Sequence, residues 1–336
     1  MYWAGKRVLV TGGAGHIGSA LVGRLAEEGA QVRVVDNLWR GSVEYLLDEN
    51  GKPIIDLEKD FINSDLREMR NSDKAMEDID FVFHLADVVA GITFVFDNQP
   101  FVYRSNALIN SNVFESAMRQ KVQGLVYVGA ACAYPHEKQN DLSHPLFKEE
   151  DMYPANPESA YGWSKLMGEY ECSLYSKSGM LNAAILRLHN VYGPHSDLSL
   201  ERSQVIPATI RKAIRYPTER FVIWGNGKQN RSFVYVSDVV EALLLAAQKG
   251  LNKGPIQIGT DKKTTIDELA DVVIEISGKD IKKEYDTTKP VGDIGRAADC
   301  SLANSTLGWK PRVSIEEGLR ETYEWAFSHL KSHGKS

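Results

Sequence analysis

A tyrosine and a lysine four residues apart form the strongest chemical pattern in the sequence. Tyr161 and Lys165 begin a stretch whose apolar residues keep helical spacing as far as Leu174. Residues four apart share one face of a helix, so we expect the phenol and the ammonium group to point the same way. A cation beside a phenol lowers its pKa, which suits a base that works near neutral pH. The pair therefore predicts proton transfer by Tyr161, assisted by Lys165.

A glycine-rich turn near the N-terminus has the spacing of a dinucleotide site. The residues Thr11-Gly12-Gly13-Ala14-Gly15-His16-Ile17-Gly18 follow an apolar run and open a helical stretch. Gly12 permits a tight turn, Gly15 lets the backbone approach a pyrophosphate, and Gly18 allows the helix to pack closely on the sheet. The helix N-terminus attracts the anion. We therefore predict that a dinucleotide binds at Gly12, Gly15, His16, Ile17 and Gly18.

A carboxylate at the end of the next predicted strand indicates which dinucleotide binds. Asp36 follows Gly18 by eighteen residues, a position from which it can accept hydrogen bonds from the adenosine ribose. Its charge would repel the 2′-phosphate of NADP, so NAD is the predicted cofactor, although Arg33 and Arg40 lie nearby. Further along the chain, Asp65 can cap a helix and, with Leu66, reach the adenine; a helix cap alone is the alternative.

The elements that must position these residues alternate along the chain. Apolar runs bounded by Gly, Asp or Asn are separated by stretches with helical spacing, an alternation typical of βαβ units and of a parallel sheet buried on both faces. We predict an α/β fold, namely a Rossmann-type doubly wound parallel sheet with a smaller α/β C-terminal substrate lobe. The predicted strands are 7–11, 31–36, 80–84, 125–129, 181–188 and 231–236.

The predicted domain organisation follows from where this alternation breaks down. Pro and Gly gather at 135–157 and 193–227, which we expect to be long loops. An amphipathic helix is expected at 314–330. We assign the chain to an NAD-binding domain (1–187, to which 228–258 return), a nucleotide-sugar-binding lobe (188–227 and 259–330) and a flexible tail (331–336).

Composition excludes several classes of protein. The chain has 336 residues, 43% of them hydrophobic, and 39 Lys and Arg against 45 Asp and Glu give a net charge of −6, so no basic field attracts a nucleic acid. No apolar run approaches the roughly 18–20 residues that span a bilayer, and no signal peptide opens the chain, so we predict a cytoplasmic protein. Three scattered cysteines and the pair His329 and His333 lack further ligands, so we predict no metal.

The glycine-rich turn and the Tyr161–Lys165 pair together resemble the short-chain dehydrogenase/reductase superfamily, in its extended branch that modifies nucleotide sugars. The resemblance implies that the two residues take a proton from a sugar hydroxyl while hydride passes to tightly held NAD, which leaves a ketone at sugar C4. It also implies a nucleotide diphosphate sugar as the substrate. Lys165 and three further residues are implied as cofactor contacts: Asn37, Leu85 and Ala86.

The resemblance extends to the substrate side of the site. His84-Leu85-Ala86-Asp87 matches a motif of the family except that Asp87 replaces the usual Ala. Arg231 and Arg296 lie where the family places arginines that clamp a diphosphate, a role that suits the forked guanidinium. The substrate-binding residues implied in this way are Gly91, Asn190, Gln204, Arg231 and Arg296.

Four further segments narrow the resemblance within this branch: 131–135, 187–194, 224–229 and 307–309. In these segments the sequence is most similar to the GDP-mannose 3,5-epimerase group. In that group the C4 ketone acidifies C3 and C5, and a Cys and a Lys on opposite faces of the sugar ring move their protons. Cys132 stands at the position of the Cys, whereas Gln204 stands at that of the Lys. An amide cannot exchange a proton with carbon, so this departure puts a double epimerisation in doubt. The alternative for Cys132 is a small residue that fills a packed turn.

A second departure from the family removes a hydroxyl group. The family has Ser or Thr four residues before Tyr134, where it shares a proton with the catalytic tyrosine, and the residue here is Ala130. A methyl group neither donates nor accepts a hydrogen bond. We interpret Ala130 as an engineered substitution that inactivates the enzyme, with a naturally different mechanism as the alternative. Restoring Ser or Thr should then raise turnover at least about tenfold with little change in substrate affinity.

Several functions and one assembly are compatible with these residues. A UDP-sugar 4-epimerase is the first alternative, and a non-catalytic NAD-binding protein is another. A nucleotide-sugar 4,6-dehydratase is disfavoured because Ala131 and Cys132 replace the Asp-Glu pair of that group. The helices expected at 101–119 and 161–176 resemble those that pair as a four-helix bundle in the family, so we predict a homodimer. The nucleotide base, the sugar, and the carbon that inverts (C3, C4 or C5) stay open.

Overall fold

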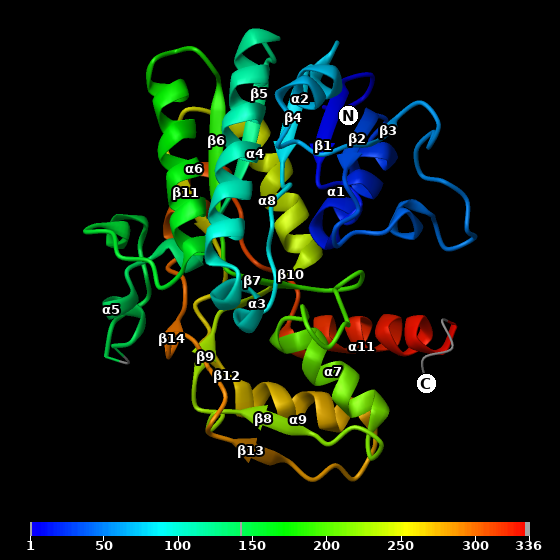
Figure 1. Cartoon of the computed structure of the whole chain (residues 1–336), viewed down its shortest axis with the longest axis vertical. Helices are drawn as coiled ribbons and strands as arrows, with labels where there is room; N and C mark the ends of the chain where they lie inside the picture. The colour runs from blue at the N-terminus through cyan, green and yellow to red at the C-terminus, as the bar shows by residue number, and fades with distance from the viewer. Residues whose placement is uncertain (1, 142, 333–336) are drawn as a thin grey trace.

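The centre of the molecule is a seven-stranded sheet in which every strand runs parallel to its neighbours (Figure 1). This computed structural model describes residues 2–141 and 143–332. The strand order is β11-β6-β5-β4-β1-β2-β3, so the order reverses between β1 and β4, which is where such sheets bind ligands. The strands are β1 Arg7–Thr11, β2 Gln31–Asp36, β3 Phe61–Asn63, β4 Phe81–His84, β5 Gly124–Ala130, β6 Ala183–Leu188 and β11 Pro255–Ile258.

Helices cover both faces of this sheet, because side chains alternate along each strand. In β1, Val8 and Val10 pack against one hydrophobic core and Leu9 against another, and all three are fully buried. The first core contains α1 (His16–Glu27) and α8 (Val236–Lys249). The second contains α2 (Met69–Met76), α4 (Gln99–Arg119) and α6 (Ala160–Lys177). The predicted α/β, doubly wound architecture is confirmed.

A second body lies below the sheet in the view of Figure 1 and has its own core. Ile210, Phe221, Leu269 and Leu319 are buried together there. Its helices are α7 Val205–Arg215, α9 Ile266–Ser277 and α11 Ile315–Ser332. Its strands form three small sheets: β10 (Phe233–Tyr235) with β7 (Asn190–Tyr192), β9 (Asn230–Arg231) with β12 (Thr264–Thr265) and β14 (Gly295–Arg296), and β8 (Val222–Trp224) with β13 (Glu284–Asp286).

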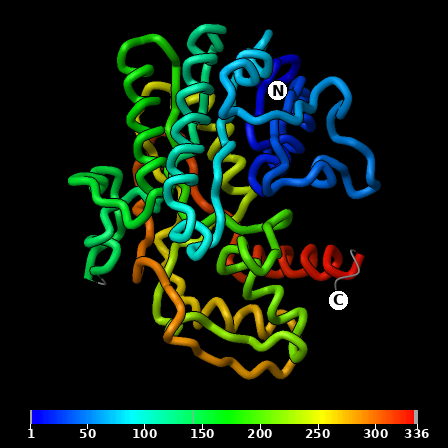
Figure 2. The backbone as a smooth tube through the Cα atoms, viewed as in Figure 1, coloured from blue at the N-terminus to red at the C-terminus, as the bar shows by residue number. Residues whose placement is uncertain are grey.

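Three shorter helices complete the described part of the chain. They are α3 Ile92–Asp97, α5 His136–Gln139 and α10 Ser301–Leu307, with single 3₁₀ turns at Val43–Leu46, Ala131–Ala133 and Glu149–Met152. Figure 2 shows that the chain enters the lower body after β6 and returns to the sheet at α8. Ala303, Leu307 and Trp309 then pack into the core of the sheet. The domain boundaries given above stay a prediction.

Some elements differ from the prediction. The strand expected at 231–236 is two strands, β9 and β10, which pair with different partners, and Val236 already begins α8. Pairing partners are distant in sequence, so local alternation could not show the break at Ser232. The loop expected at 193–227 contains α7, and β3 and β11 were not predicted. Helix α11 continues through Ser332 into the tail predicted to be flexible, and 333–336 lie outside the described residues.

Candidate active site

A cavity of about 990 Å³ opens at the carboxyl ends of the central strands, where the strand order reverses. Its lining includes residues from both the sheet and the lower body. Every site residue predicted from the sequence lines this one cavity. They are Ala130, Cys132, Tyr161 and Lys165; the cofactor set Gly12, Gly15, His16, Ile17, Gly18, Asp36, Asn37, Asp65, Leu66, Leu85 and Ala86; and the substrate set Gly91, Asn190, Gln204, Arg231 and Arg296.

The glycine-rich turn fits a dinucleotide pyrophosphate. Gly12 has a φ of +70°, and a Cβ on it would lie 2.9 Å from the backbone nitrogen of Ala86. A Cβ on Gly18 would collide with the carbonyl oxygen of Gly12, so only glycine allows α1 to pack this closely on the turn. Helix α1 begins at His16, and no side chain caps the N–H groups of its first turn. These N–H groups are therefore free to bind an anion.

Asp36 lies at the end of β2, where its carboxylate is held by the backbone. Oδ2 accepts a hydrogen bond from the Ala14 nitrogen (3.1 Å) and Oδ1 accepts one from the Leu38 nitrogen (2.8 Å). Burial raises the pKa of Asp36, and these two bonds oppose the rise. Arg33 donates instead to the carbonyl oxygens of Ala75 and Glu77, so it is engaged away from Asp36. The arrangement suits the ribose hydroxyls of NAD.

Asp65 differs from its predicted role as a helix cap. Helix α2 begins at Met69 with Glu68 as its N-cap residue. Asp65 instead accepts hydrogen bonds from the backbone and side-chain nitrogens of Arg67, at 2.9 and 3.0 Å. The helix starts later than the local pattern suggests, so the cap prediction is wrong, whereas Asp65 does line the cavity.

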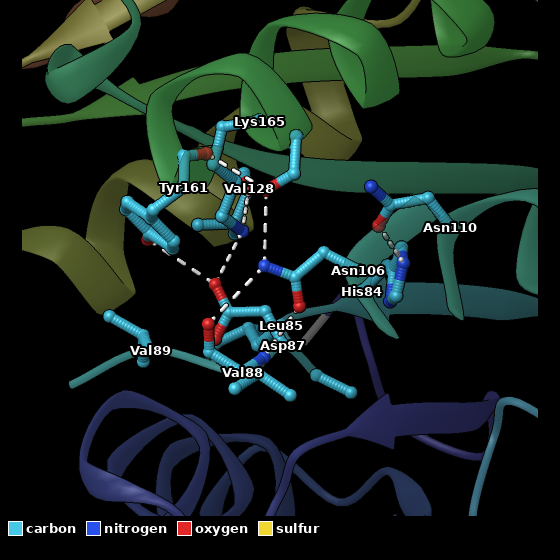
Figure 3. A network of polar contacts seen from close by, with 12 residues as sticks. His84, Leu85, Asp87, Val88, Val89, Asn106, Asn110, Val128, Tyr161 and Lys165 are labelled. Carbon is cyan, nitrogen blue, oxygen red and sulfur yellow. Dashed lines mark hydrogen bonds and ion pairs between the residues drawn. The ribbon is translucent and has the colours of Figure 1, made fainter. Parts of the chain in front are cut away.

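Tyr161 and Lys165 share the face of α6 that meets the sheet, and both contact Asp87 (Figure 3). Lys165 Nζ lies 2.7 Å from Asp87 Oδ2 and donates to the Val128 carbonyl oxygen at 2.8 Å. Tyr161 Oη donates to the same Asp87 oxygen at 3.3 Å. Burial raises the pKa of Tyr161 well above its usual value, and Asp87 raises it further. The net pKa of Tyr161 is therefore raised and not lowered, because burial and the Asp87 carboxylate both favour the neutral phenol.

Thr11, the last residue of β1, holds the start of the loop that contains Asp87. Thr11 Oγ1 accepts hydrogen bonds from the backbone nitrogens of Leu85 and Ala86, both at 3.1 Å, and contacts His84 Nδ1 at 2.8 Å. His84 Nε2 lies 3.0 Å from Asn110 Oδ1, and burial lowers the pKa of His84 to about 3. His84 is therefore neutral at pH 7 and adds no charge beside Lys165.

Cys132 lies against an arginine that comes from the far end of the chain. Arg296 Nη2 donates to Cys132 Sγ at 3.3 Å, and Nη1 of the same guanidinium donates to Gln139. The thiolate form of a cysteine is the form that can take up a proton. Arg231 also faces the cavity, so two guanidinium groups are available for a diphosphate. Gln204 is the residue before α7, and its amide stands at the position expected for the Lys of the 3,5-epimerase group.

A cluster of ionisable residues beside these arginines was not predicted from the sequence. His136 Nδ1 lies 2.6 Å from Asp293 Oδ1, and ligand atoms of His136, Glu158 and Asp293 lie within 4.8 Å of one another. Asp293 also accepts a hydrogen bond from Asn140 (3.0 Å), so its carboxylate is satisfied by protein groups. No spacing in the sequence links residues so far apart, and only the fold brings them together.

The sequence and the fold of this chain are similar to those of known proteins. The model of the NAD dependent epimerase/dehydratase family matches residues 8–259. The chain belongs to that family. It is 33% identical to the GDP-mannose 3,5-epimerase of Arabidopsis thaliana over 326 residues, which cover 96% of this chain and 83% of that protein. The predicted family and its NAD dependence are confirmed.

Two solved structures are similar to almost the whole chain. The UDP-glucose 4-epimerase of Thermotoga maritima, solved with UDP-glucose, has a TM-score of 0.86 at 29% identity and covers 96% of this chain and 99% of its own. The UDP-N-acetylglucosamine 4-epimerase of Methanobrevibacter ruminantium, solved with UDP-N-acetylmuramic acid, has a TM-score of 0.85 at 28% identity and covers 97% and 99%. The chain is thus similar both to a 3,5-epimerase and to 4-epimerases. No helix in the described ranges is long and apolar enough to cross a membrane.

Proposed function

We propose that this enzyme epimerises a nucleotide diphosphate sugar through transient oxidation at sugar C4, in the manner of a GDP-mannose 3,5-epimerase. The observation that carries the proposal is the placement of Cys132 beside Arg296 in the cavity that also contains Tyr161 and Lys165. Tyr161 and Lys165 suit oxidation of a sugar hydroxyl. Cys132 suits proton exchange at a carbon next to the resulting ketone.

The residues divide the work of the oxidation step. Bound NAD supplies the hydride acceptor. Tyr161 takes the proton of the sugar hydroxyl at its phenolic oxygen. Lys165 donates a hydrogen bond to the Val128 carbonyl oxygen, which holds its ammonium group 5.9 Å from the centre of the Tyr161 ring. Arg231 and Arg296 bind the diphosphate through their guanidinium groups, which orients the sugar toward Tyr161.

Cys132 then moves a proton at carbon. A ketone at C4 acidifies the hydrogens at C3 and C5. The thiolate form of Cys132 takes one of these protons, and inversion is completed when a second group delivers a proton to the opposite face of the same carbon. Gln204 stands where the family has the second group and cannot exchange such a proton. Of the two residues at the proton-exchange positions, Cys132 and Gln204, only Cys132 can therefore exchange a proton with carbon.

A 4-epimerase is the second candidate, and Gln204 favours it. Without an acid or base on the opposite face, the simplest inversion is at C4 itself, through return of hydride to either face of the ketone. The similarity to the 4-epimerases of Thermotoga maritima and Methanobrevibacter ruminantium supports this candidate. Both candidates use the same oxidation step.

Incubation with GDP-mannose and with UDP-glucose in heavy water separates the two candidates. We expect proton magnetic resonance to show deuterium at C3 or C5, and we expect Cys132→Ser to abolish this exchange while reduced NAD still forms. Cys300→Ser is the matched control, because Cys300 donates to the Gly259 carbonyl oxygen and does not line the cavity. Inversion at C4 without exchange would assign a 4-epimerase, and no reaction with either sugar would count against both candidates as stated.

The cofactor preference gives a separate prediction. We expect purified protein to carry NAD and to bind NAD more tightly than NADP, because Asp36 repels a 2′-phosphate. Asp36→Asn keeps a carbonyl oxygen for the ribose but removes the charge, so it should reduce the ratio of the two affinities by about tenfold or more. Calorimetric titration of both dinucleotides measures this ratio. Tighter binding of NADP by the unmodified chain would contradict the role given to Asp36.

Two long helices support the proposed homodimer. Helices α4 and α6 lie side by side (Figure 1), and Ser111 and Tyr175 link them through hydrogen bonds to Glu171 and Glu115. Large apolar side chains on their outer surfaces stay exposed, and those of α6 recur at helical spacing, which indicates one uncovered face. The exposed side chains are Phe101, Tyr103, Trp163, Tyr170 and Leu174.

We expect light scattering to give twice the 37.5 kDa mass of the chain at micromolar concentration. Leu174→Glu, which puts a charge on the uncovered face, should shift the protein to the monomer, whereas Met180→Glu, at an exposed residue beyond the end of α6, should not. A stable monomer of the unmodified chain would rule out the four-helix bundle. A cytoplasmic location stays a prediction.

A further inference from the structure

One buried carboxylate in the cavity has no part in the mechanism above. The Asp87 side chain is only 10% exposed, and its Oδ2 contacts both Lys165 Nζ (2.7 Å) and Tyr161 Oη (3.3 Å), as Figure 3 shows. The family motif places Ala at this position. The carboxylate is therefore a property of this chain, and it lies on the two residues that carry the oxidation step.

The second departure from the family pattern concerns the same tyrosine. Ala130 stands where the family has a Ser or Thr that shares a proton with the catalytic tyrosine, and Ala130 lines the cavity together with Tyr161 and Asp87. One departure removes a hydrogen-bonding partner of the phenol, and the other supplies one. A chain that had merely lost its activity would have no reason to gain the second.

We propose that Asp87 replaces the missing hydroxyl at position 130 as the proton partner of Tyr161. The proposal rests on the proposed function. As the sugar is oxidised, the C4–H and O–H bonds break and the C4 carbonyl forms. The hydride goes to the nicotinamide of NAD, the hydroxyl proton goes to Tyr161 Oη, and the phenolic proton moves to Asp87 Oδ2. When hydride returns, the protons retrace this route, so the cycle leaves Asp87 ionised.

The surroundings of Asp87 hold it in the position that this transfer requires. Asn106 on α4 binds the backbone of Val88 on both sides: its Oδ1 accepts from the Val88 nitrogen at 2.6 Å, and its Nδ2 donates to the Val88 carbonyl oxygen at 3.2 Å. The same Nδ2 donates to Ser164 Oγ at 3.1 Å, and Ser164 lies between Tyr161 and Lys165 on α6. The loop and the catalytic helix are thus fastened to one side chain, which fixes their separation.

Asp87 contacts both Lys165 and Tyr161, and a role as the counter-ion of Lys165 explains only the first of these contacts. Burial of Lys165 requires a negative or dipolar partner, and both Asp87 and the Val128 carbonyl oxygen serve. The phenol of Tyr161, however, points its O–H at the same carboxylate oxygen. In this arrangement the phenol of Tyr161 is neutral, and its proton faces Asp87 Oδ2. When the sugar hydroxyl passes its proton to Tyr161 Oη, the phenolic proton can therefore move to Asp87.

Restoring the hydroxyl in two backgrounds tests the proposal. The measured quantity is the rate at which bound NAD is reduced in a single turnover with GDP-mannose or UDP-glucose, whichever reacts. The absorbance of reduced nicotinamide monitors this rate. We expect Asp87→Ala to slow this step about 10²–10⁴-fold, and Ala130→Ser to recover about tenfold or more in that background. In the unmodified chain, Ala130→Ser should change the rate less than about threefold, because its partner role is already filled by Asp87. This expectation replaces the gain of about tenfold that the sequence alone predicts. Asp261→Asn, an exposed carboxylate outside the cavity, is the control.

A titration of Tyr161 tests the proposal without any turnover. The difference in phenolate absorbance between a protein and its Tyr161→Phe version reports the pKa of this one tyrosine, and we expect Asp87→Asn to lower that pKa by about one unit or more. Ala is the residue of the family pattern at position 87, so Asp87→Ala provides a second variant that the fold accommodates. An unchanged pKa, or a gain of tenfold or more from Ala130→Ser in the unmodified chain, would overturn the proposal. If neither sugar reduces NAD yet the pKa falls, the proposed substrate is wrong and the contact of Asp87 with Tyr161 stands.

Discussion

Replacing Tyr161 with Phe should slow reduction of bound NAD by about 10²–10⁴-fold, which corresponds to about 3–5 kcal/mol of activation free energy. In the proposed mechanism the phenolic oxygen receives the proton of the sugar hydroxyl, and phenylalanine keeps the ring and removes only that atom. Binding of the nucleotide sugar should change little, because Arg231 and Arg296, the residues proposed to bind the diphosphate, are unchanged. A fall in the turnover number with a nearly constant dissociation constant is the expected pattern.

Stopped-flow measurement of reduced nicotinamide, with calorimetry for the dissociation constant, checks this result. Tyr153→Phe is the matched control, because Tyr153 is 56% exposed and lies outside the cavity. Equal rates in the unmodified chain and in Tyr161→Phe would assign the base to another residue. A loss of binding equal to the loss of rate would instead make Tyr161 a binding residue.

Breaking the ion pair between Glu169 and Arg187 should lower the free energy of unfolding by about 3–5 kcal/mol. Arg187 donates to both carboxylate oxygens of Glu169, with Nε to Oε2 at 2.7 Å and Nη2 to Oε1 at 2.6 Å. The two side chains are 3% and 6% exposed. Glu169→Gln leaves the buried guanidinium without its counter-charge, and Arg187 also holds the Glu149 carbonyl oxygen at 2.7 Å.

Urea denaturation of the protein without added ligands measures this cost. Glu169→Leu combined with Arg187→Met should recover most of the loss, because two apolar residues carry no unpaired charge. Glu28→Gln is the control: its partner Arg24 is 43% exposed, so that pair should contribute less than about 1 kcal/mol. If Glu169→Gln cost no more than Glu28→Gln, the pair would be irrelevant to stability.

Glu169 follows Lys165 by four residues and Tyr161 by eight, so the same face of α6 carries the catalytic pair and this anchor. Arg187 lies in β6, so the ion pair holds the catalytic helix on the sheet. A loosened α6 would also move Tyr161 relative to Asp87. We therefore expect the single variants to lose activity as well as stability, and the apolar pair to recover both.

The sequence by itself determined those features that depend on short stretches of backbone. The positive φ of Gly12, the helix that begins at His16 and the shared face of Tyr161 and Lys165 follow from residues within one or two turns of chain. The alternation of strand and helix likewise predicted the parallel sheet, because strand and helical periods are local. The resemblance to the family predicted the remaining site residues, and these line one cavity although they are far apart in the chain.

Only the tertiary structure decided which charges meet. Asp87 was visible in the sequence as an unusual residue, but its contact with Tyr161, 74 residues away, was not. Arg296 reaches Cys132 across 164 residues, and His136 reaches Asp293 across 157. The pKa of Tyr161 rises where the i, i+4 argument predicted a fall, because burial is a property of the whole packed core and because the Asp87 charge comes from the loop after β4. Local spacing sets which groups share a face, and the fold sets the dielectric surroundings and the opposing charge that determine what those groups do.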